Sequence, residues 1–227
     1  REPVEEDINL WEKVYYVGAN AEISGEIQGE IVLDKYNEDN FSVDINQDGK
    51  IQYVMLEGEP EHQDSLIRTD STIKKITNLG IEVEKLASDS GNWQSSQAYE
   101  KTTQWINEFS NKIEVIFSNN DDMALGAISA FENENINIED RPIIVGIDGI
   151  PEALNCIKNG TLKGTVFNDY IRQAKMIVDI AYDLKYNEDS KLMEEVNETH
   201  EFKTSYKKIT NENVDKYIKE AGLEEFK

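Results

Sequence analysis

The stretch that decides the fold covers residues 113–133 and reads IEVIFSNNDDMALGAISAFEN. Its opening segment, Ile113–Phe117, is a short run of mostly apolar residues with the length of a buried strand. Two asparagines and two aspartates then lead into a predicted helix, Asp121–Asn133. A buried strand that passes through a short polar turn into a helix is typical of a parallel α/β sheet.

The same alternation continues in both directions along the chain. Further strands are expected at Val14–Val17, Ile51–Leu56, Ile81–Leu86, Ile143–Ile147, Leu162–Phe167 and Phe202–Tyr206. Further helices are expected at Ile23–Tyr36, Asp64–Leu79, Gln94–Phe109, Pro151–Lys158, Asp169–Leu184 and Asn211–Ala221. This order predicts an α/β fold, a doubly wound parallel sheet covered on both faces. We expect the charged stretch Lys185–Asn197 to be mobile.

The charge balance limits the partners that the chain can have. It contains 46 acidic and 23 basic residues, a net charge of -23 over 227 residues. This charge repels phosphate backbones and anionic lipid, so we expect no nucleic acid and no membrane partner, whereas divalent cations are attracted. No stretch approaches the length of a membrane span. The single cysteine, Cys156, is expected to be a buried thiol, and the start at Arg1 indicates processing or trimming.

Two glycines occupy one face of the predicted helix Ile23–Tyr36. Gly25 and Gly29 have the spacing of a membrane helix pair, but the interleaved Glu26 and Glu30 exclude that interpretation. We therefore expect the glycines to allow close packing of this helix on the sheet.

Polar residues follow five of the predicted strands, at the edge where an open parallel sheet binds ligands. The residues of interest are His62, Asp64, Arg68, Trp93, Asn120, Asp148 and Asn168. Most of them also have a simpler interpretation. Asp64 and Arg68 are spaced as a helical ion pair, and Trp93 could be a core residue. Asn120, Asp148 and Asn168 could cap helices. Together they suit a sugar, whose C–H face packs on an aromatic ring and whose hydroxyls bond to carboxylates, amides and arginine.

Patterns for catalysis are lacking in the sequence. The histidines His62 and His200 are far apart, and no nucleophile elbow, Cys/His set or glycine-rich phosphate loop occurs. We therefore expect a binding protein and not an enzyme such as a glycosidase.

Residues Asp44–Gln52 match the first nine positions of a calcium-binding loop. Position 12 is Met55, which cannot bind the ion, so a remote carboxylate is needed. Glu114 is the candidate, because strand order 2-1-3-4-5 would make its strand a neighbour of the strand after the loop. The expected ligands are Asp44, Asn46, Asp48, the Lys50 carbonyl, Gln52 and Glu114. The loop lies at the edge of the sheet opposite to the polar residues that follow the strands, so we expect a structural ion. A metal-free Asp/Asn/Gly loop is the alternative.

The chain resembles the galactose/glucose-binding family of type I periplasmic solute-binding proteins of sugar ABC transporters. The resemblance rests on Tyr15–Gly18, Ser24–Gly29, Asp44–Gln52, Glu57–Asp64, Lys112–Val115, Asn119–Ala124, Asp148, Pro151–Leu154 and Gly164–Asp169. The His-x-Asp-x-x-x-Arg set together with the calcium loop is specific to this branch of the family. The resemblance implies that the sugar contacts fall on His62, Asp64, Arg68, Trp93, Asn120, Asp148 and Asn168. It implies that the calcium ligands are the six expected from the loop and Glu114.

The function implied is an extracytoplasmic receptor, periplasmic or a cell-surface lipoprotein, that binds D-galactose or D-glucose and delivers it to an ABC permease. The alternative is a sugar sensor that acts on a chemoreceptor or a histidine kinase. A sugar-responsive repressor is disfavoured, because a basic DNA-binding headpiece is lacking and the charge is negative. The sequence does not separate glucose from galactose.

The resemblance also implies two lobes. Residues 18–167 with 205–227 correspond to the complete C-terminal lobe, and residues 1–17 with 168–204 to pieces of the N-terminal lobe. In the family, most of that second lobe precedes the position that matches Arg1. We therefore expect this chain to bind sugar weakly or not at all, and the helix Asp169–Leu184 to have a bare apolar face.

Overall fold

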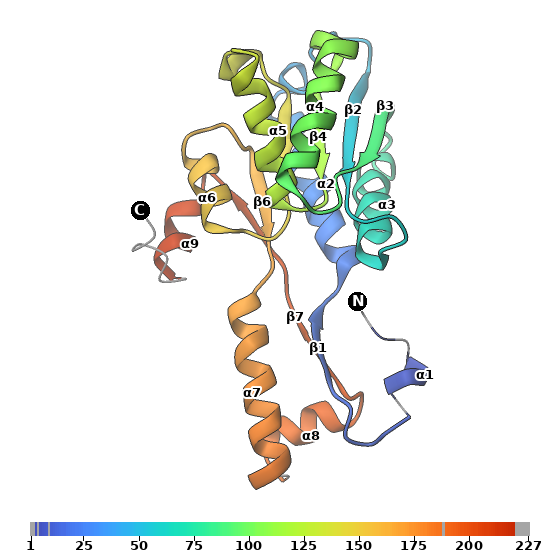
Figure 1. Cartoon of the computed structure of the whole chain (residues 1–227), viewed down its shortest axis with the longest axis vertical. Coiled ribbons are helices and arrows are strands. Elements are labelled where there is room, and N and C mark those ends of the chain that lie inside the picture. Colours follow the sequence, from blue (N-terminus) through green and yellow to red (C-terminus); the bar gives the residue numbers. More distant parts are fainter. Residues whose placement is uncertain (1–2, 4, 9, 188, 221–227) are drawn as a thin grey trace. The chain divides into compact units, whose positions relative to one another are not determined.

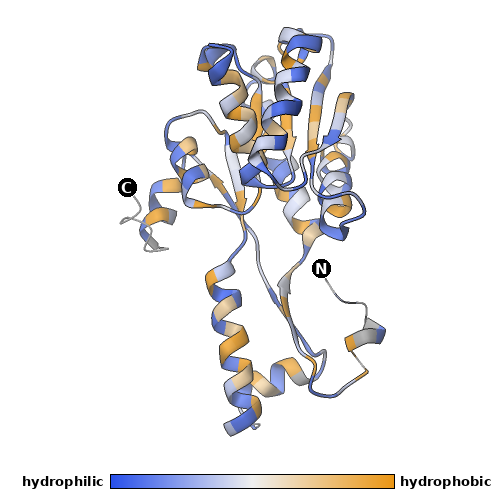
Figure 2. Cartoon of the chain, in the orientation of Figure 1, coloured by the Kyte–Doolittle hydropathy of each residue, from blue (hydrophilic) through white to orange (hydrophobic). Residues whose placement is uncertain are grey.

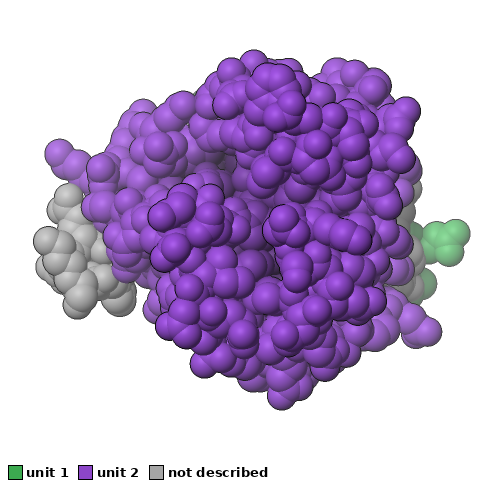
Figure 3. Space-filling view, turned by 90° about the horizontal axis from the view of Figure 1, so that it is seen from above, with its two compact units in different colours: residues 1–20, 168–206 green, residues 21–167, 207–227 purple. Residues whose placement is uncertain are grey.

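The structure is a computed structural model that describes residues 3, 5–8, 10–187 and 189–220 (Figure 1). The chain divides into two compact units. The larger unit comprises Ala21–Phe167 and Lys207–Lys227, and the smaller comprises Arg1–Asn20 and Asn168–Tyr206 (Figure 3). Each unit is described separately below.

A six-stranded sheet forms the centre of the larger unit, in the order β3-β2-β4-β5-β6-β8. Its strands are β2 (Lys50–Glu57), β3 (Glu82–Ser90), β4 (Val115–Ser118), β5 (Ile143–Val145), β6 (Gly164–Phe167) and β8 (Lys207–Thr210). The first five are parallel, and β8 runs antiparallel to β6. The predicted α/β class and the order 2-1-3-4-5 are confirmed. The sequence prediction missed β8.

Helices cover both faces of this sheet (Figure 1). They are α2 (Ala21–Glu38), α3 (Gln63–Thr77), α4 (Ser95–Phe109), α5 (Asp121–Asn133), α6 (Pro151–Lys158) and α9 (Val214–Glu220), with short 3-10 turns at Asn40–Ser42, Ser110–Lys112 and Ile138–Asp140. Helix α2 packs with α3, and α4 packs with α5. Because both faces are covered, β2 is buried continuously from Ile51 to Leu56 and not only at alternate residues. Apolar residues accordingly concentrate in the central strands β2, β4 and β5 (Figure 2).

The glycines of α2 face helix α3 and not the sheet, which corrects the expectation from the sequence. A Cβ atom on Gly25 would lie 2.0 Å from Oγ of Ser71 and 2.5 Å from the carbonyl oxygen of Arg68. A Cβ atom on Gly29 would lie 2.7 Å from the carbonyl oxygen of Thr72. Only a residue without a side chain allows the two helix backbones to come this close.

The smaller unit contains a two-stranded parallel sheet of β1 (Tyr16–Ala19) and β7 (Glu201–Thr204). It also contains α1 (Glu5–Ile8), α7 (Tyr170–Tyr186) and α8 (Lys191–Asn197). The described residues of the stretch Lys185–Asn197, which we expect to be mobile, include the end of α7 and all of α8, where Ser190 is the N-cap and its Oγ accepts a hydrogen bond from the Met193 N–H. Met193 and Val196 pack with Ile180 in a small core. The outer face of α7 leaves Ile177, Val178, Tyr182 and Tyr186 exposed.

Two further expectations can be compared with the fold. None of the described helices has the length and apolar character needed to cross a membrane. Cys156 lies in α6 as expected, but it is half-buried and not fully buried. Partial burial raises the pKa of its thiol above the ordinary value. Residue 221, the expected end of the last helix, lies outside the described residues.

Candidate functional site

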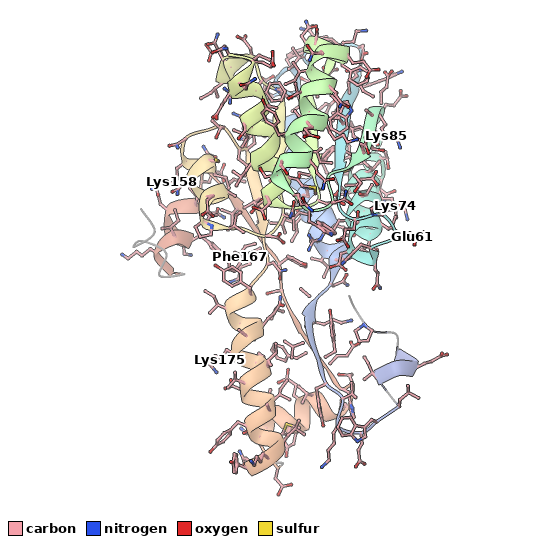
Figure 4. All side chains as sticks on the ribbon, in the orientation of Figure 1. Glu61, Lys74, Lys85, Lys158, Phe167 and Lys175 are labelled. Carbon is pink, nitrogen blue, oxygen red and sulfur yellow. The ribbon has the colours of Figure 1, made fainter. Side chains whose placement is uncertain are left out.

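His62 ends the loop from β2 into α3, and Asp64 and Arg68 lie in α3 itself. His62 is the N-cap of α3, where its Nδ1 accepts a hydrogen bond of 3.2 Å from the Asp64 N–H. This role of a histidine in helix capping was not expected from the sequence. Asp64 occupies the first turn of α3 and is half-buried. Glu61, just before the cap, is exposed on the outside of the loop (Figure 4).

Trp93 lies in the loop between β3 and α4, next to His62. The two rings meet edge to face, with centroids 5.2 Å apart and planes at 80°. Trp93 has a φ of 62° and its neighbour Asn92 a φ of 49°, so two consecutive residues adopt the left-handed conformation. Hydrogen bonds of the Asn92 side chain with Ser90 and Gln97 hold this loop. Trp93 also packs against the core, so its simpler interpretation as a core residue is correct in part.

Arg68 is buried and joins three elements of the site. Its Nη1 donates a hydrogen bond of 2.7 Å to the backbone carbonyl of Asn119. The same nitrogen lies 3.7 Å from Oδ1 of Asp148, and the guanidinium carbon lies 5.9 Å from the centre of the Trp93 ring. Arg68 therefore reaches across the sheet edge to Asp148, whereas the sequence had suggested a helical pair with Asp64 as its simplest role.

Asp148 follows β5 in a conformation that is rare for an aspartate, with a φ of 125°. Its N–H donates to the Val166 carbonyl of β6 at 2.8 Å, which fixes the turn beside Phe167 at the end of that strand (Figure 4). Asp148 does not cap α6, whose N-cap is Ile150, so that simpler interpretation is wrong. Burial raises the pKa of its carboxyl group to about 7, although the guanidinium of Arg68 acts to lower it.

Asn120 is the N-cap of α5, as the simpler interpretation of the sequence held. Its Oδ1 accepts a hydrogen bond of 3.0 Å from the Met123 N–H. Its Nδ2 donates to the Trp93 carbonyl at 3.3 Å, so the cap also fixes the loop that carries the indole. The structure thus brings together residues from four strand-to-helix junctions, which we call the rim: His62, Asp64, Arg68, Trp93, Asn120 and Asp148.

Asn168 belongs to the smaller unit, and its contacts lie within that unit. Its Oδ1 accepts a hydrogen bond of 2.6 Å from Nε2 of Gln173, which also donates to Oγ1 of Thr204 at 3.1 Å. Asn168 does not cap α7, because Asp169 is the N-cap. The expected place of Asn168 in a sugar site therefore stays a prediction.

Two buried residues on either side of Asn120 were not found from the sequence. Asn119 is fully buried, and its Oδ1 accepts hydrogen bonds from the Gly58 N–H at 3.1 Å and from Oγ of Ser65 at 2.9 Å. Asp121 is also fully buried, and its Oδ2 accepts from the N–H groups of Gly149 at 2.6 Å and Ile150 at 3.0 Å. The available signal was a set of polar residues directly after a fully buried strand, where loop N–H groups need acceptors.

The calcium-like loop lies at the other edge of the sheet and is organised by carboxylates. Glu114 is 1% exposed, and its Oε1 accepts from the N–H groups of Ile45 at 2.7 Å and Asn46 at 3.2 Å. Its Oε2 accepts from the Gln52 N–H at 2.9 Å. Burial raises the pKa of Glu114, and the three N–H groups act to lower it.

The side chains of the loop also converge on one another. Asp44 accepts from the N–H groups of Asp48 at 3.1 Å and Gly49 at 3.0 Å, and Gly49 makes the tight turn with a φ of 85°. Nδ2 of Asn46 donates to Oε1 of Gln52 at 2.9 Å. The part of the chain that the structure describes has no group of three or more His, Cys, Asp or Glu side chains that could hold a metal ion. A calcium ion here would therefore depend on amide and carbonyl oxygens as well as carboxylates, which is a donor set that calcium accepts.

A hollow of about 560 Å³ also lies in the larger unit, away from the rim. It is lined by residues such as Phe41, Ile45, Ile138 and Leu162, and by no residue of the rim. Its lining also includes charged residues such as Lys35, Glu139 and Arg141.

Comparison with known proteins gives a consistent result. A model of the periplasmic binding protein domain matches residues 4–189. The D-galactose/methyl-galactoside binding periplasmic protein of Haemophilus influenzae is 40% identical over 185 residues, 81% of this chain and 54% of that protein. A putative rhizopine-binding protein of Rhizobium meliloti is 30% identical over 191 residues, 83% of this chain and 57% of that protein.

A solved structure agrees with these matches. The solute-binding protein of an ABC transporter from Bacillus halodurans, with bound myo-inositol, has a TM-score of 0.73 and 28% identity, over 89% of this chain and 62% of that one. The chain spans about half the length of the curated relatives that it matches. The family is one of solute-binding, non-catalytic proteins, as expected from the sequence. Because the domain model covers well over half of the chain, this protein belongs to the periplasmic binding protein family, in its type I sugar-binding group.

Proposed function

We propose that the larger unit is the sugar-binding lobe of an extracytoplasmic receptor for D-galactose or D-glucose that delivers the sugar to an ABC transporter. The observation that carries the proposal is the meeting of Trp93 with His62, Arg68 and Asp148 at the carboxyl edge of the sheet. The similarity to a galactose-binding protein at 40% identity supports a hexose as the ligand.

The rim can bind a sugar without changing it. The indole of Trp93 offers a flat apolar face for the C–H groups of a pyranose. Asp148 and Asp64 accept hydrogen bonds from hydroxyls, while Arg68 and the amide of Asn120 donate them, and the bonds that involve a charged group are the strongest. Arg68 lies 3.7 Å from Asp148, so both groups can contact neighbouring hydroxyls of one ring.

The two units correspond, in this proposal, to a complete lobe and to part of a second lobe. Asn168 would contribute from the smaller unit as a further donor. A second lobe would enclose the other face of the sugar, and closure about a hinge would bury the ligand. Transfer to an ABC permease is proposed because the relative from Bacillus halodurans is the solute-binding protein of such a transporter.

We also propose a structural calcium ion in the loop Asp44–Gln52. The residues fit the ion, because Gly49 makes the required turn and the oxygens of Asp44, Asn46, Asp48 and Gln52 lie in one hydrogen-bonded group with Glu114 behind them. Asp44, Asn46, Asp48, the Lys50 carbonyl, Gln52 and Glu114 would hold it. The bound ion would neutralise the carboxylates and stabilise the loop.

The experiment is a thermal-shift series with D-glucose, D-galactose and myo-inositol. It uses this chain and a longer chain that adds a complete second lobe. We expect either hexose to raise the melting temperature of the longer chain, by the equivalent of about 2.7 kcal/mol at about 100 times Kd, and to leave this chain nearly unchanged. The Trp93→Ala variant should lose the effect, and Trp11→Phe, at an exposed position, should keep it.

Two results would contradict the proposal. Stabilisation by myo-inositol but by neither hexose would show that the sugar assignment is wrong. Stabilisation of this chain alone to the same extent as the longer chain would show that a second lobe is not needed. The alternative function, a sensor that acts on a chemoreceptor or histidine kinase, binds the same sugar and differs only in the partner that it contacts.

A further inference from the structure

We propose that Asn119 and Asp121 are positioning residues for the rim. Asn119 fixes the loop after β2, and Asp121 fixes the loop after β5. The proposal rests on the proposed function of the rim in hexose binding. Neither side chain is expected to touch the sugar, because both are fully buried.

The position of the turn between β4 and α5 explains why two residues can serve two loops. Strand β4 lies between β2 and β5 in the sheet. The turn that follows β4 is therefore next to the loop after β2 on one side and to the loop after β5 on the other. Three consecutive residues follow β4 here. The side chain of Asn119 contacts the segment after β2, that of Asn120 contacts the loop after β3, and that of Asp121 contacts the loop after β5.

Asn119 holds the loop after β2. Its Oδ1 accepts from the Gly58 N–H, from Oγ of Ser65 and, at 3.3 Å, from Oγ1 of Thr69. Gly58 in turn supports the indole of Trp93, since a Cβ atom there would lie 2.1 Å from the ring. The backbone carbonyl of Asn119 accepts the hydrogen bond from Arg68. One residue thus fixes the surface under the indole and the end of the arginine.

Asp121 holds the loop after β5. Its Oδ2 accepts from the N–H groups of Gly149 and Ile150, the two residues directly after Asp148. Its Oδ1 accepts from Oγ1 of Thr165 in β6 at 2.7 Å. A Cβ atom on Gly146 would lie 2.1 Å from the same Oδ1, so the carboxylate is enclosed on that side as well. These bonds hold Asp148 in its rare backbone conformation beside Arg68.

The two sets of hydrogen bonds share no side-chain partner, and this separation makes the proposal specific. If both residues only stabilised the fold, their loss would lower stability without a local pattern. If they position the rim, the loss of each should disturb one loop and spare the other. Side chains that orient binding groups through hydrogen bonds are expected to act in this way.

The test compares Asn119→Ala and Asp121→Ala with two controls at exposed positions, Asn133→Ala and Asp122→Ala. The first readout is the ¹⁵N NMR spectrum of this chain without sugar. Asn119→Ala should shift the signals of the Gly58 amide and the Trp93 indole N–H, and leave Gly149 and Ile150 in place. Asp121→Ala should give the reverse pattern.

The second readout is the Kd for D-galactose and D-glucose of the longer chain with a complete second lobe. We expect each alanine variant to weaken binding about tenfold, the effect of losing roughly one hydrogen bond of ordinary strength at a binding group. Asp121→Asn should restore both readouts, because its amide oxygen can still accept from Gly149 and Ile150 and its nitrogen can donate to Thr165. Asn119→Asp should restore the readouts only in part, because it keeps the three bonds that Oδ1 accepts but loses the bond of 3.1 Å that Nδ2 donates to Oγ1 of Thr69. These variants also serve if an alanine variant fails to fold.

The outcomes separate the two proposals. Unchanged loop signals in both alanine variants, or equal disturbance of both loops by each, would overturn the positioning roles. Displaced loops with unchanged hexose affinity would also overturn them. If the longer chain binds no hexose at all, the proposed function fails, and the loop signals alone then decide whether each residue holds its loop.

Discussion

The indole of Trp93 rests directly on the backbone of Gly58, where an added Cβ atom would lie 2.1 Å from Cζ2 of the ring. The contact is possible only because residue 58 has no side chain. It joins the loop after β2 to the loop after β3. His62 also contacts the indole, with the two rings edge to face and their centroids 5.2 Å apart.

Substitution of this glycine should move the ring. In Gly58→Ala the methyl group cannot fit beside the indole, so we expect Trp93 to be displaced at a cost of about 1–3 kcal/mol in unfolding free energy. The measurement is tryptophan fluorescence with chemical unfolding, in a background where Trp11 and Trp105 are phenylalanine. Gly160→Ala is the control, because nothing lies within 4 Å of its added Cβ, although its φ of 79° brings a strain cost of its own. An unchanged Trp93 emission spectrum in Gly58→Ala would contradict the contact.

Glu114 should contribute to stability with or without calcium. In Glu114→Gln one of the two oxygens is replaced by a donor, which leaves at least one of the N–H groups of Ile45, Asn46 and Gln52 without its acceptor. We expect a loss of about 1–3 kcal/mol in unfolding free energy. The exposed Glu82→Gln on β3 is the control and should stay within about 0.5 kcal/mol of the wild type.

The calcium proposal adds a second expectation for the same variant. Calcium should raise, and chelator lower, the melting temperature of the wild type and of Glu82→Gln. The response of Glu114→Gln should be much smaller. If the wild type melts at the same temperature with calcium and with chelator, the loop holds no ion.

The contact between α2 and α3 should be intolerant of a larger residue. The Cβ atom of Gly25→Ala would lie 2.5 Å from the carbonyl oxygen of Arg68, a backbone atom that cannot turn away. We expect a loss of about 1–3 kcal/mol. Glu26→Ala, exposed on the same helix, is the control and should be nearly neutral. Since Arg68 lies on α3, the variant should also shift the guanidinium signals of Arg68 in NMR spectra. A loss of stability without that shift would mean that this helix contact does not affect the position of Arg68 in the rim.

The sequence predicted the sheet well because its strands are buried on both faces. Runs such as Ile113–Phe117 are mostly apolar regardless of the details of packing, so the alternation of strands and helices and the strand order followed from general rules. Strand β8 was missed because its sequence, LysLysIleThr, has one fully buried residue, Ile209, and forms only by pairing with β6. Helix α8 was missed for a related reason. Its sequence is highly charged, and its few apolar residues are buried only by packing on α7.

Helix α2 shows where a pattern misleads. Ile23, Ile27 and Ile31 recur every four residues along this helix, but of the three only Ile31 is buried, and Ile23 is 43% exposed. In its first three turns the buried residues are Ala21, Ser24, Gly25, Gln28 and Gly29, and apolar burial at Ile31, Val32 and Leu33 follows only later. Gln28 is fully buried because its Nε2 donates to the carbonyls of Ser118 and Val145 at the ends of two strands. Only the tertiary structure shows those two carbonyls to be acceptors that need a partner.

The rim could be located but not assembled from the sequence. Any residue after a parallel strand lies at the carboxyl edge, so the positions of Arg68 and Asp148 near that edge followed from topology. The contact between these two side chains did not, since it depends on the height of Arg68 above the sheet. The sequence also gave no means of separating the buried Asn119 from its neighbour Asn120, which caps a helix.

The buried carboxylates should make stability fall as the pH rises. Burial raises the pKa of Asp121 to about 6, above its value of about 4 in an unfolded chain. A carboxyl group with a raised pKa in the folded state binds its proton more tightly there, so its contribution is complete below about pH 4 and is lost as the pH rises through about 6. A difference of about two pH units corresponds to about 3 kcal/mol. Asp148, with its pKa raised to about 7, acts in the same direction over a wider range.

Asp121→Asn should therefore reduce the dependence of unfolding free energy on pH between about 4 and 6, since the amide keeps the hydrogen bonds and does not ionise. It should also lower the pKa of Asp148, because the charge of Asp121 raises that pKa in the wild type. Urea unfolding across this pH range, with chelator present to exclude an effect of calcium, gives the slope. Asp122→Asn, next to it but exposed, should keep most of the wild-type slope. Equal slopes in the wild type and Asp121→Asn would mean that Asp121 is already ionised at about pH 4 in the folded protein, and that the two loop N–H groups and Thr165 outweigh the effect of burial.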